Sequence, residues 1–186
     1  RGTDSRRQGY LDRTQRADLL RCAAPAPRPF FECLCLLPLR PGAAAALEAR
    51  DFDKRTRTLV IRIDKANPGR VLTLPPPTAT FFERHTKDKI GTAPIFANEA
   101  GRRWQRDNWG YFMRLAADAA GLPAEISLYS LRHSTITDLV MAGVPTLTVA
   151  QIAGTGVAQI ERHYGHLLPT AAVNALATLE IGRAHV

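Results

Sequence analysis

Prolines and glycines divide this chain into short segments, and this punctuation limits its fold more than any other feature. Pro25, Pro27 and Pro29 alternate with other residues, so no helix can continue through this stretch. Three consecutive prolines, Pro75-Pro76-Pro77, interrupt the chain again. Because 186 residues suffice for one substantial core and are too few for two ordinary domains, we expect a single domain built from short elements.

Most of these segments space their apolar residues as a helix does. Helices are predicted at residues 11–22, 30–37, 43–49, through Phe81 and Phe82, and at 107–120, 130–142, 146–153 and 170–179. Residues 58–63 and 71–74 are instead rich in β-branched and aliphatic residues and are joined by a loop of medium length, which predicts an antiparallel hairpin. The pattern indicates an α+β fold that is mainly helical, with a small antiparallel sheet or hairpin.

The charge balance favours a polyanionic partner. The chain has 25 Lys and Arg against 17 Asp and Glu, a formal net charge of +8, which suits nucleic acid or an anionic membrane surface. The longest apolar run, residues 29–39, is interrupted by Glu32 and is shorter than the roughly 18 residues that a membrane span needs. We therefore expect no membrane span. Since no secretory leader opens the chain, we expect a cytoplasmic location.

Neither the cysteines nor the two ends indicate a functional site. Cys22, Cys33 and Cys35 are too few for a four-cysteine zinc site and odd in number for disulfides, so we predict buried thiols and no metal or other cofactor. Residues 1–10 lack periodicity and are expected to be disordered or the start of a fragment. The last seven residues, 180–186, resemble a non-native tail. The expected domain is residues 11–179.

Two polar segments carry residues suited to chemistry. In the first, Leu128, Leu131, Thr135 and Leu139 have helical spacing and are predicted to face the core. Tyr129, Arg132 and His133 would then lie together on a polar face that could hold an anion, although such a face is more often simply solvated. In the second segment, Tyr164 is followed by glycine and flanked by histidines. By itself this pattern is typical of an amphipathic tyrosine with its hydroxyl at the surface.

Taken together, these segments resemble the catalytic domain of a tyrosine recombinase of the phage integrase type. The resemblance covers roughly residues 11–179 and rests on Leu-Pro-Leu-Arg-Pro-Gly, the hairpin, Tyr-Ser-Leu-Arg-His-Ser, and Gly-Thr-Gly-Val-Ala-Gln-Ile-Glu-Arg-His-Tyr-Gly-His-Leu. At the positions that match the family in order and spacing, the implied catalytic residues are Arg40, Lys65, Arg132 and Tyr164.

Two positions depart from the family's catalytic set. Tyr129 stands where a first histidine is expected, three residues before Arg132, and Thr155 stands where a second is expected, nine residues before Tyr164. Both are polar substitutes, and we interpret Tyr129, His133 and Thr155 as supporting residues. The departures put the rate of the reaction in doubt more than its chemistry.

The resemblance implies attack of the tyrosine oxygen on a DNA phosphodiester, which gives a 3′-phosphotyrosine and a free 5′-hydroxyl. Two planar guanidiniums match the charged phosphate oxygens, and Lys65 would protonate the leaving 5′-oxygen. Because an ordinary tyrosine has a pKa of about 10, Tyr164 needs nearby positive charge or a base. His133 or His163 could assist, and we interpret His133 as a structural hydrogen bonder beside Arg132.

The implied function is site-specific recombination that integrates or excises a mobile element, with double-stranded DNA as the partner and a tetramer as the assembly on DNA. Phosphate contacts are predicted at Arg70, Arg102, Arg103 and Arg106. Three alternatives stay open: a DNA-binding remnant that no longer cuts, a type IB topoisomerase, and a basic RNA-associated protein. The RNA-associated alternative leaves the spacing of the four catalytic candidates unexplained.

Overall fold

A computed structural model describes residues 9–62 and 69–167 of the chain. Its elements are α1 (Arg13–Cys22), α2 (Arg28–Leu36), α3 (Pro41–Ala45), β1 (Phe52–Asp53), β2 (Thr58–Ile61), β3 (Arg70–Thr73), α4 (Pro76–Thr86), α5 (Arg106–Ala119), α6 (Leu128–Met141), α7 (Thr146–Ala153) and α8 (Val157–Tyr164). Short 3-10 turns occupy Ala49–Asp51 and Gly165–Leu167. The predicted α+β fold is confirmed.

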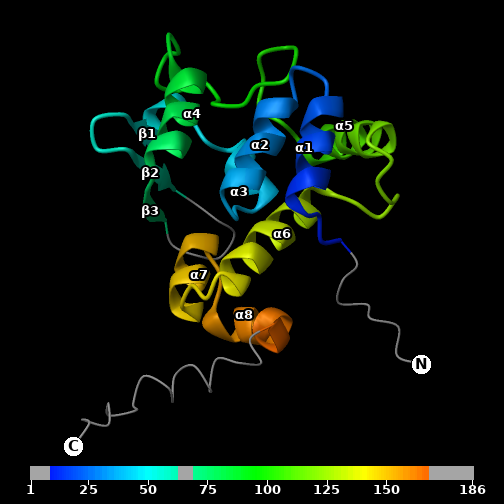
Figure 1. The fold of residues 1–186 in the computed structure, drawn as a ribbon. Coiled ribbons are helices and arrows are strands. Elements are labelled where there is room, and N and C mark those ends of the chain that lie inside the picture. Colours follow the sequence, from blue (N-terminus) through cyan, green and yellow to red (C-terminus); the bar gives the residue numbers. More distant parts are fainter. Residues whose placement is uncertain (1–8, 63–68, 168–186) are drawn as a thin grey trace, which may run out of the picture.

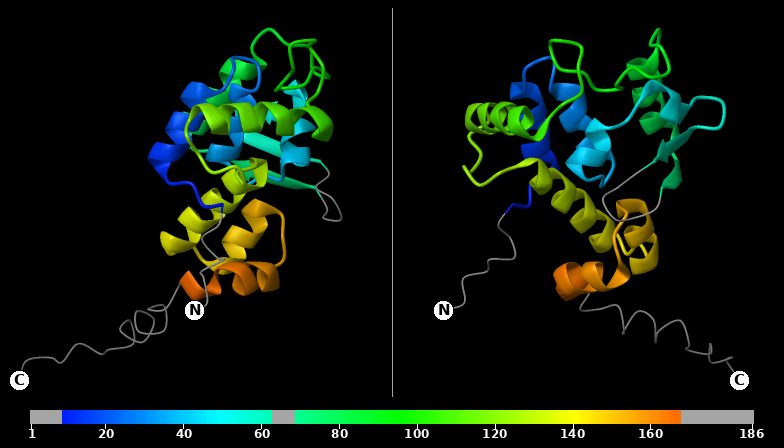
Figure 2. Two further views of the ribbon diagram at one scale, coloured as in Figure 1. Left: turned by 90° about the vertical axis from the view of Figure 1, so that its right-hand side faces the viewer. Right: turned by 180° about the vertical axis from the view of Figure 1, so that it is seen from behind.

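Helix α6 joins a larger part of the molecule to a smaller one (Figures 1 and 2). Helices α1 to α5 and the sheet form the larger part, whose core is a continuous apolar cluster that includes Phe30, Phe31 and Phe82. Helices α7 and α8 form the smaller part at one end of α6. Its separate core consists of Ile136, Val140, Val149, Ala150, Ala153, Ile160 and Tyr164.

The prolines act as the sequence predicts. Helix α1 begins with a capping box between Asp12 and Gln15 and ends at Cys22, before the three prolines. Pro29 then lies in the first turn of α2, where its missing N–H is not needed. Predicted and observed bounds agree within two residues for α1 and α2. Helix α3 instead begins at Pro41 and ends at Ala45, earlier than predicted at both ends.

The sheet has one strand more than the sequence predicts. Strands β2 and β3 form the predicted antiparallel hairpin, with Thr58 opposite Thr73 and Ile61 opposite Arg70. The two-residue strand β1 pairs with β2 along the other edge, which gives the order β1-β2-β3. The hairpin loop with Lys65 lies outside the described residues, as do the predicted helix at 170–179, the tail at 180–186 and residues 1–8.

Helix α6 corrects the prediction of a polar outer face. Leu128, Leu131 and Thr135 are buried as expected, but Arg132 is only 8% exposed whereas Tyr129 is 60% exposed. The two side chains therefore do not share one solvated surface. Since α6 lies between the two parts of the molecule, most of its circumference is covered by protein (Figure 1).

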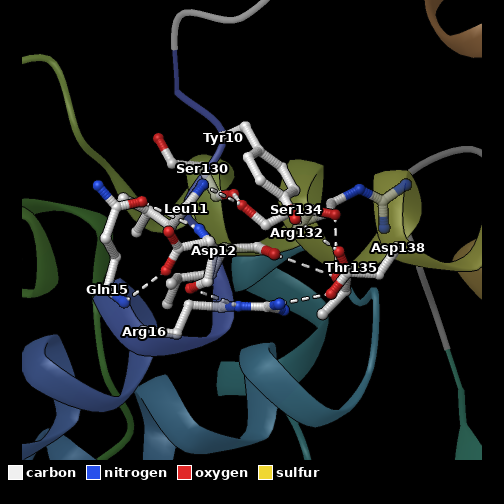
Figure 3. A network of polar contacts seen from close by, with 11 residues as sticks. Tyr10, Leu11, Asp12, Gln15, Arg16, Ser130, Arg132, Ser134, Thr135 and Asp138 are labelled. Carbon is white, nitrogen blue, oxygen red and sulfur yellow. Dashed lines mark hydrogen bonds and ion pairs between the residues drawn. The ribbon is translucent and has the colours of Figure 1, made fainter. Parts of the chain in front are cut away.

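A polar network fastens the start of the domain to α6 (Figure 3). Arg16 on α1 forms an ion pair with Asp138 on α6, and the Tyr10 hydroxyl donates to Asp138 Oδ1 at 3.0 Å. The backbone N–H of Leu11 donates to Ser134 Oγ at 2.8 Å. These contacts join residues more than 120 positions apart, so they fix how α1 sits against the helix that carries Arg132.

We expect Asp138→Asn to lower the free energy of unfolding by about 1.5–3 kcal/mol, the usual worth of hydrogen bonds to charged groups. The loss arises because Arg16 is only 7% exposed and would lose its counter-charge. Urea unfolding measures the change. The matched control is Asp18→Asn, since the Arg21–Asp18 pair is largely exposed and should contribute about 0–1 kcal/mol. Equal effects of the two substitutions would contradict a structural role for the Asp138 network.

The cysteine prediction holds for one thiol of three. Cys33 is fully buried, and burial raises the pKa of its thiol well above the ordinary value. Cys22 and Cys35 are half-buried, and all three are free. Within the described residues, no three His, Cys, Asp or Glu side chains gather where they could hold a metal ion. None of the described helices is both long and apolar enough to cross a bilayer.

Candidate active site

Three arginines from three different elements donate to consecutive backbone carbonyls at the end of α7. The bonds run from Arg70 Nε to Ile152 O (3.2 Å), from Arg132 Nη1 to Ala153 O (2.9 Å) and from Arg40 Nη1 to Gly154 O (2.6 Å). The last carbonyls of a helix lack partners within the helix and carry its partial negative charge. The carboxyl end of α7 therefore binds three guanidiniums, which come from β3, from α6 and from the residue before α3.

The turn at Gly154 makes these carbonyls available. Gly154 has a φ of 65°, the left-handed conformation that a glycine adopts without strain and that ends a helix. The N–H of the next residue, Thr155, closes the turn by donating to Ala150 O at 3.0 Å. Thr155 is thus half-buried beside the carbonyl that accepts from Arg40.

Arg132 links the two chain segments that meet here. Besides Ala153 O, its Nη1 donates to the carbonyl of Pro38, two residues before Arg40. Arg40 and Arg132 bind neighbouring carbonyls, so their guanidiniums lie side by side rather than on opposite sides of the molecule. Two planar cations held in this way can present paired N–H donors to one phosphate group.

Tyr164 reaches the same region from α8, a helix that the sequence analysis did not predict. It is the last residue of α8 and only 8% exposed, with its ring in the smaller core. Its hydroxyl lies 2.9 Å from Nδ1 of His133, the residue after Arg132. The simplest interpretation of the sequence placed the tyrosine hydroxyl at the surface. In the structure the hydroxyl is instead hydrogen-bonded to the residue that follows Arg132.

Burial shifts the pKa of each group of this pair in the direction that favours its uncharged form. Burial raises the pKa of Tyr164 above its ordinary value, and the positive charge of Arg132 opposes this effect. Burial lowers the pKa of His133, and the charges of His163 and His166 lower it further. Both shifts favour a protonated phenol beside a neutral imidazole.

The remaining predicted site residues are dispersed. Tyr129 is largely exposed on the first turn of α6. Arg102 and Arg103 belong to the connection between α4 and α5, at the opposite end of the molecule from α7 and α8 (Figure 1), and Arg103 forms an ion pair with Glu48. Arg106 begins α5. Phosphate contacts at these three arginines stay predictions.

Sequence reasoning treated Arg70 as a peripheral DNA contact and missed its place beside Arg40 and Arg132. The signal that could have found it is the hairpin register, because Arg70, opposite Ile61, is the first residue of β3 and follows directly on the loop that carries Lys65. The carbonyls of residues 152–154 could not be predicted as acceptors from the sequence, since every residue has a backbone carbonyl and no side chain marks these three.

Comparisons with known proteins agree with the fold. The model of the phage integrase family matches residues 14–170. The tyrosine recombinase XerD of Mycobacterium tuberculosis is 29% identical over 135 residues, which are 68% of this chain and 43% of that protein. XerD of Mycobacterium leprae is 25% identical over 138 residues, with the same coverage. The chain thus spans less than half the length of these relatives.

Solved structures of recombinases have the same fold. The Tn1549 transposon integrase in complex with transposon right end DNA superposes with a TM-score of 0.77 at 16% identity, over 97% of this chain and 68% of that one. The catalytic domain of bacteriophage HP1 integrase gives a TM-score of 0.68 at 17% identity, over 95% and 98% of the two chains. Because the family match covers most of the described residues and the fold agrees, the chain belongs to the phage integrase family and has the fold of a tyrosine recombinase catalytic domain.

Proposed function

We propose that this domain cleaves and rejoins double-stranded DNA at a specific site through a 3′-phosphotyrosyl intermediate. The observation that carries the proposal is the convergence of Arg40, Arg132 and Tyr164 around the carboxyl end of α7. These residues are up to 124 positions apart in the sequence and lie before α3, on α6 and on α8. Two guanidiniums beside a tyrosine hydroxyl are suited to hold a phosphodiester and attack its phosphorus.

In the proposed reaction, the guanidiniums of Arg40 and Arg132 bind the two non-bridging oxygens of one phosphate. Charge accumulates on these oxygens in the transition state, and donors that are already in place stabilise it without reorganisation. The Tyr164 oxygen bonds to phosphorus while the bond to the 5′-oxygen breaks. Since the phosphotyrosyl bond replaces the phosphodiester bond that is lost, the free 5′-hydroxyl can attack it to rejoin the strand.

Integration or excision of a mobile element is the use that we propose for this reaction. The similarity in fold to a transposon integrase and to a bacteriophage integrase supports it. We also propose that the full protein acts as a tetramer on DNA in the cytoplasm. The net charge of +8 suits a partner with one negative charge on every phosphate.

Covalent capture from a random pool tests the proposal and assumes no particular DNA site. The substrates are duplexes with a randomised centre and a nick near it. Cleavage then releases a short strand that diffuses away, so it cannot rejoin and the phosphotyrosyl product stays trapped. We expect denaturation-resistant complexes that are enriched for one sequence, with the nucleotide on the peptide containing Tyr164 by mass spectrometry. Binding without any covalent product would instead indicate a DNA-binding remnant. Trapping without sequence enrichment, together with relaxation of supercoiled DNA, would indicate a topoisomerase.

A further inference from the structure

His133 occupies the position from which a side chain can act on the Tyr164 hydroxyl. Its Nδ1 lies 2.9 Å from the phenol oxygen, within hydrogen-bond distance, and the ring centroids are 5.2 Å apart. The two residues come from different helices, α6 and α8, and both are at least half-buried. Tyr129, which stands where the family's pattern has a histidine, is 60% exposed.

We propose that His133 is the proton acceptor for Tyr164 in the cleavage step, an inference that rests on the proposed function. As the phenol oxygen bonds to phosphorus, its proton passes to Nδ1 of His133, which becomes an imidazolium. The bond from phosphorus to the 5′-oxygen breaks, and the leaving oxygen takes a proton from a general acid, for which Lys65 is the predicted candidate. On rejoining, the imidazolium returns its proton to the tyrosine.

The electrostatic setting explains why this proton moves only when DNA is bound. A phenol with a raised pKa does not ionise against an imidazole with a lowered pKa. Once the oxygen begins to bond to phosphorus, its proton becomes far more acidic and the neutral imidazole can accept it. The titratable groups that act on His133 are His163 on α8 and His166 in the following turn, and Arg132 acts on Tyr164.

The first test uses the free protein and needs no DNA. A hydrogen bond from the phenol to Nδ1 forms only with neutral imidazole and so holds the pKa of His133 down. Removing the hydroxyl by Tyr164→Phe should therefore raise that pKa in an NMR titration of ¹⁵N-labelled histidine. If Nδ1 instead donates its proton to the phenol oxygen, the substitution should lower the pKa, which would overturn the proposal. Tyr111→Phe is the matched control, because Tyr111 is exposed on α5 and should leave the titration unchanged.

The second test separates proton transfer from positioning. His133→Asn places an amide near the position of Nδ1, so it can still hydrogen-bond the phenol but cannot take its proton. With the captured DNA sequence, we expect single-turnover cleavage to slow about 10²–10⁴-fold while DNA binding is retained. His85→Asn, a histidine substitution beside Phe81 in the larger part of the molecule, is the control. Cleavage by His133→Asn at the starting rate would overturn the proposal.

The pH profile and the leaving group identify which step is affected. The starting protein should cleave faster as the pH rises through the pKa of His133, because only neutral imidazole accepts a proton, and His133→Asn should lose this limb. A 5′-bridging phosphorothiolate, whose sulfur leaves without protonation, should not rescue the variant. Rescue would assign the defect to the leaving group and overturn the proposal.

If the starting protein itself never traps DNA, the recombinase function fails, and the proton-acceptor role fails with it, whatever the histidine titration shows.

Discussion

Tyr164→Phe is expected to abolish covalent capture of DNA while the domain stays folded. The substitution removes only the oxygen that would attack phosphorus, and the ring still fills the smaller core among Ile136, Val149 and Ile160. Its cost in stability is the hydrogen bond to His133, about 1 kcal/mol, so urea unfolding should change little. Denaturing gels of the trapped complex measure the covalent product directly.

A tyrosine that is exposed elsewhere provides the control for this prediction. Tyr111 lies on α5, in the larger part of the molecule, and Tyr111→Phe should trap DNA as the starting protein does. Salt-dependent binding of the captured duplex should persist in Tyr164→Phe, since the guanidiniums are unchanged. Covalent product formed by Tyr164→Phe would mean that another residue is the nucleophile, and the proposed site would be wrong.

Local signals were enough to predict most of the fold. Helix α7 begins and ends at the predicted residues, 146 and 153, because a proline precedes it and a glycine follows it. Strand β1 was missed because two residues show no periodicity and pair only when β2 is already in place. Helix α8 was missed because Glu161, Arg162 and His163 make its sequence polar, and only Ile160 and Tyr164 in it are buried.

The contacts that bring the candidate site residues together could not be predicted from the sequence. The resemblance to the tyrosine recombinase family implied Arg40, Arg132 and Tyr164, yet it could not show that carbonyls 152–154 hold two of these arginines together with Arg70. The burial of Arg132 was also missed. Helical periodicity divides a helix into one buried and one exposed face, whereas α6 is covered by protein on most of its circumference. Acceptors on the backbone and burial between two parts of a molecule are properties of the tertiary fold.

Arg132→Lys should reduce cleavage by about 10²–10³-fold, the usual loss when one donor for a developing anion is removed. Lysine keeps the positive charge but not the planar fork, so one ammonium cannot serve Pro38 O, Ala153 O and a phosphate together. Because Arg132 is only 8% exposed, a carbonyl left without its donor should also lower stability by about 1–3 kcal/mol.

Cleavage and unfolding must therefore be measured on the same Arg132→Lys sample, at a temperature where urea titration shows it to be folded. Arg21→Lys is the matched control: Arg21 is exposed on α1, and its pair with Asp18 lies far along the chain from the site, so both measurements should match the starting protein. A folded Arg132→Lys that cleaves at the starting rate would show that charge alone suffices, and that the paired geometry of the two guanidiniums at the end of α7 does not stabilise the transition state.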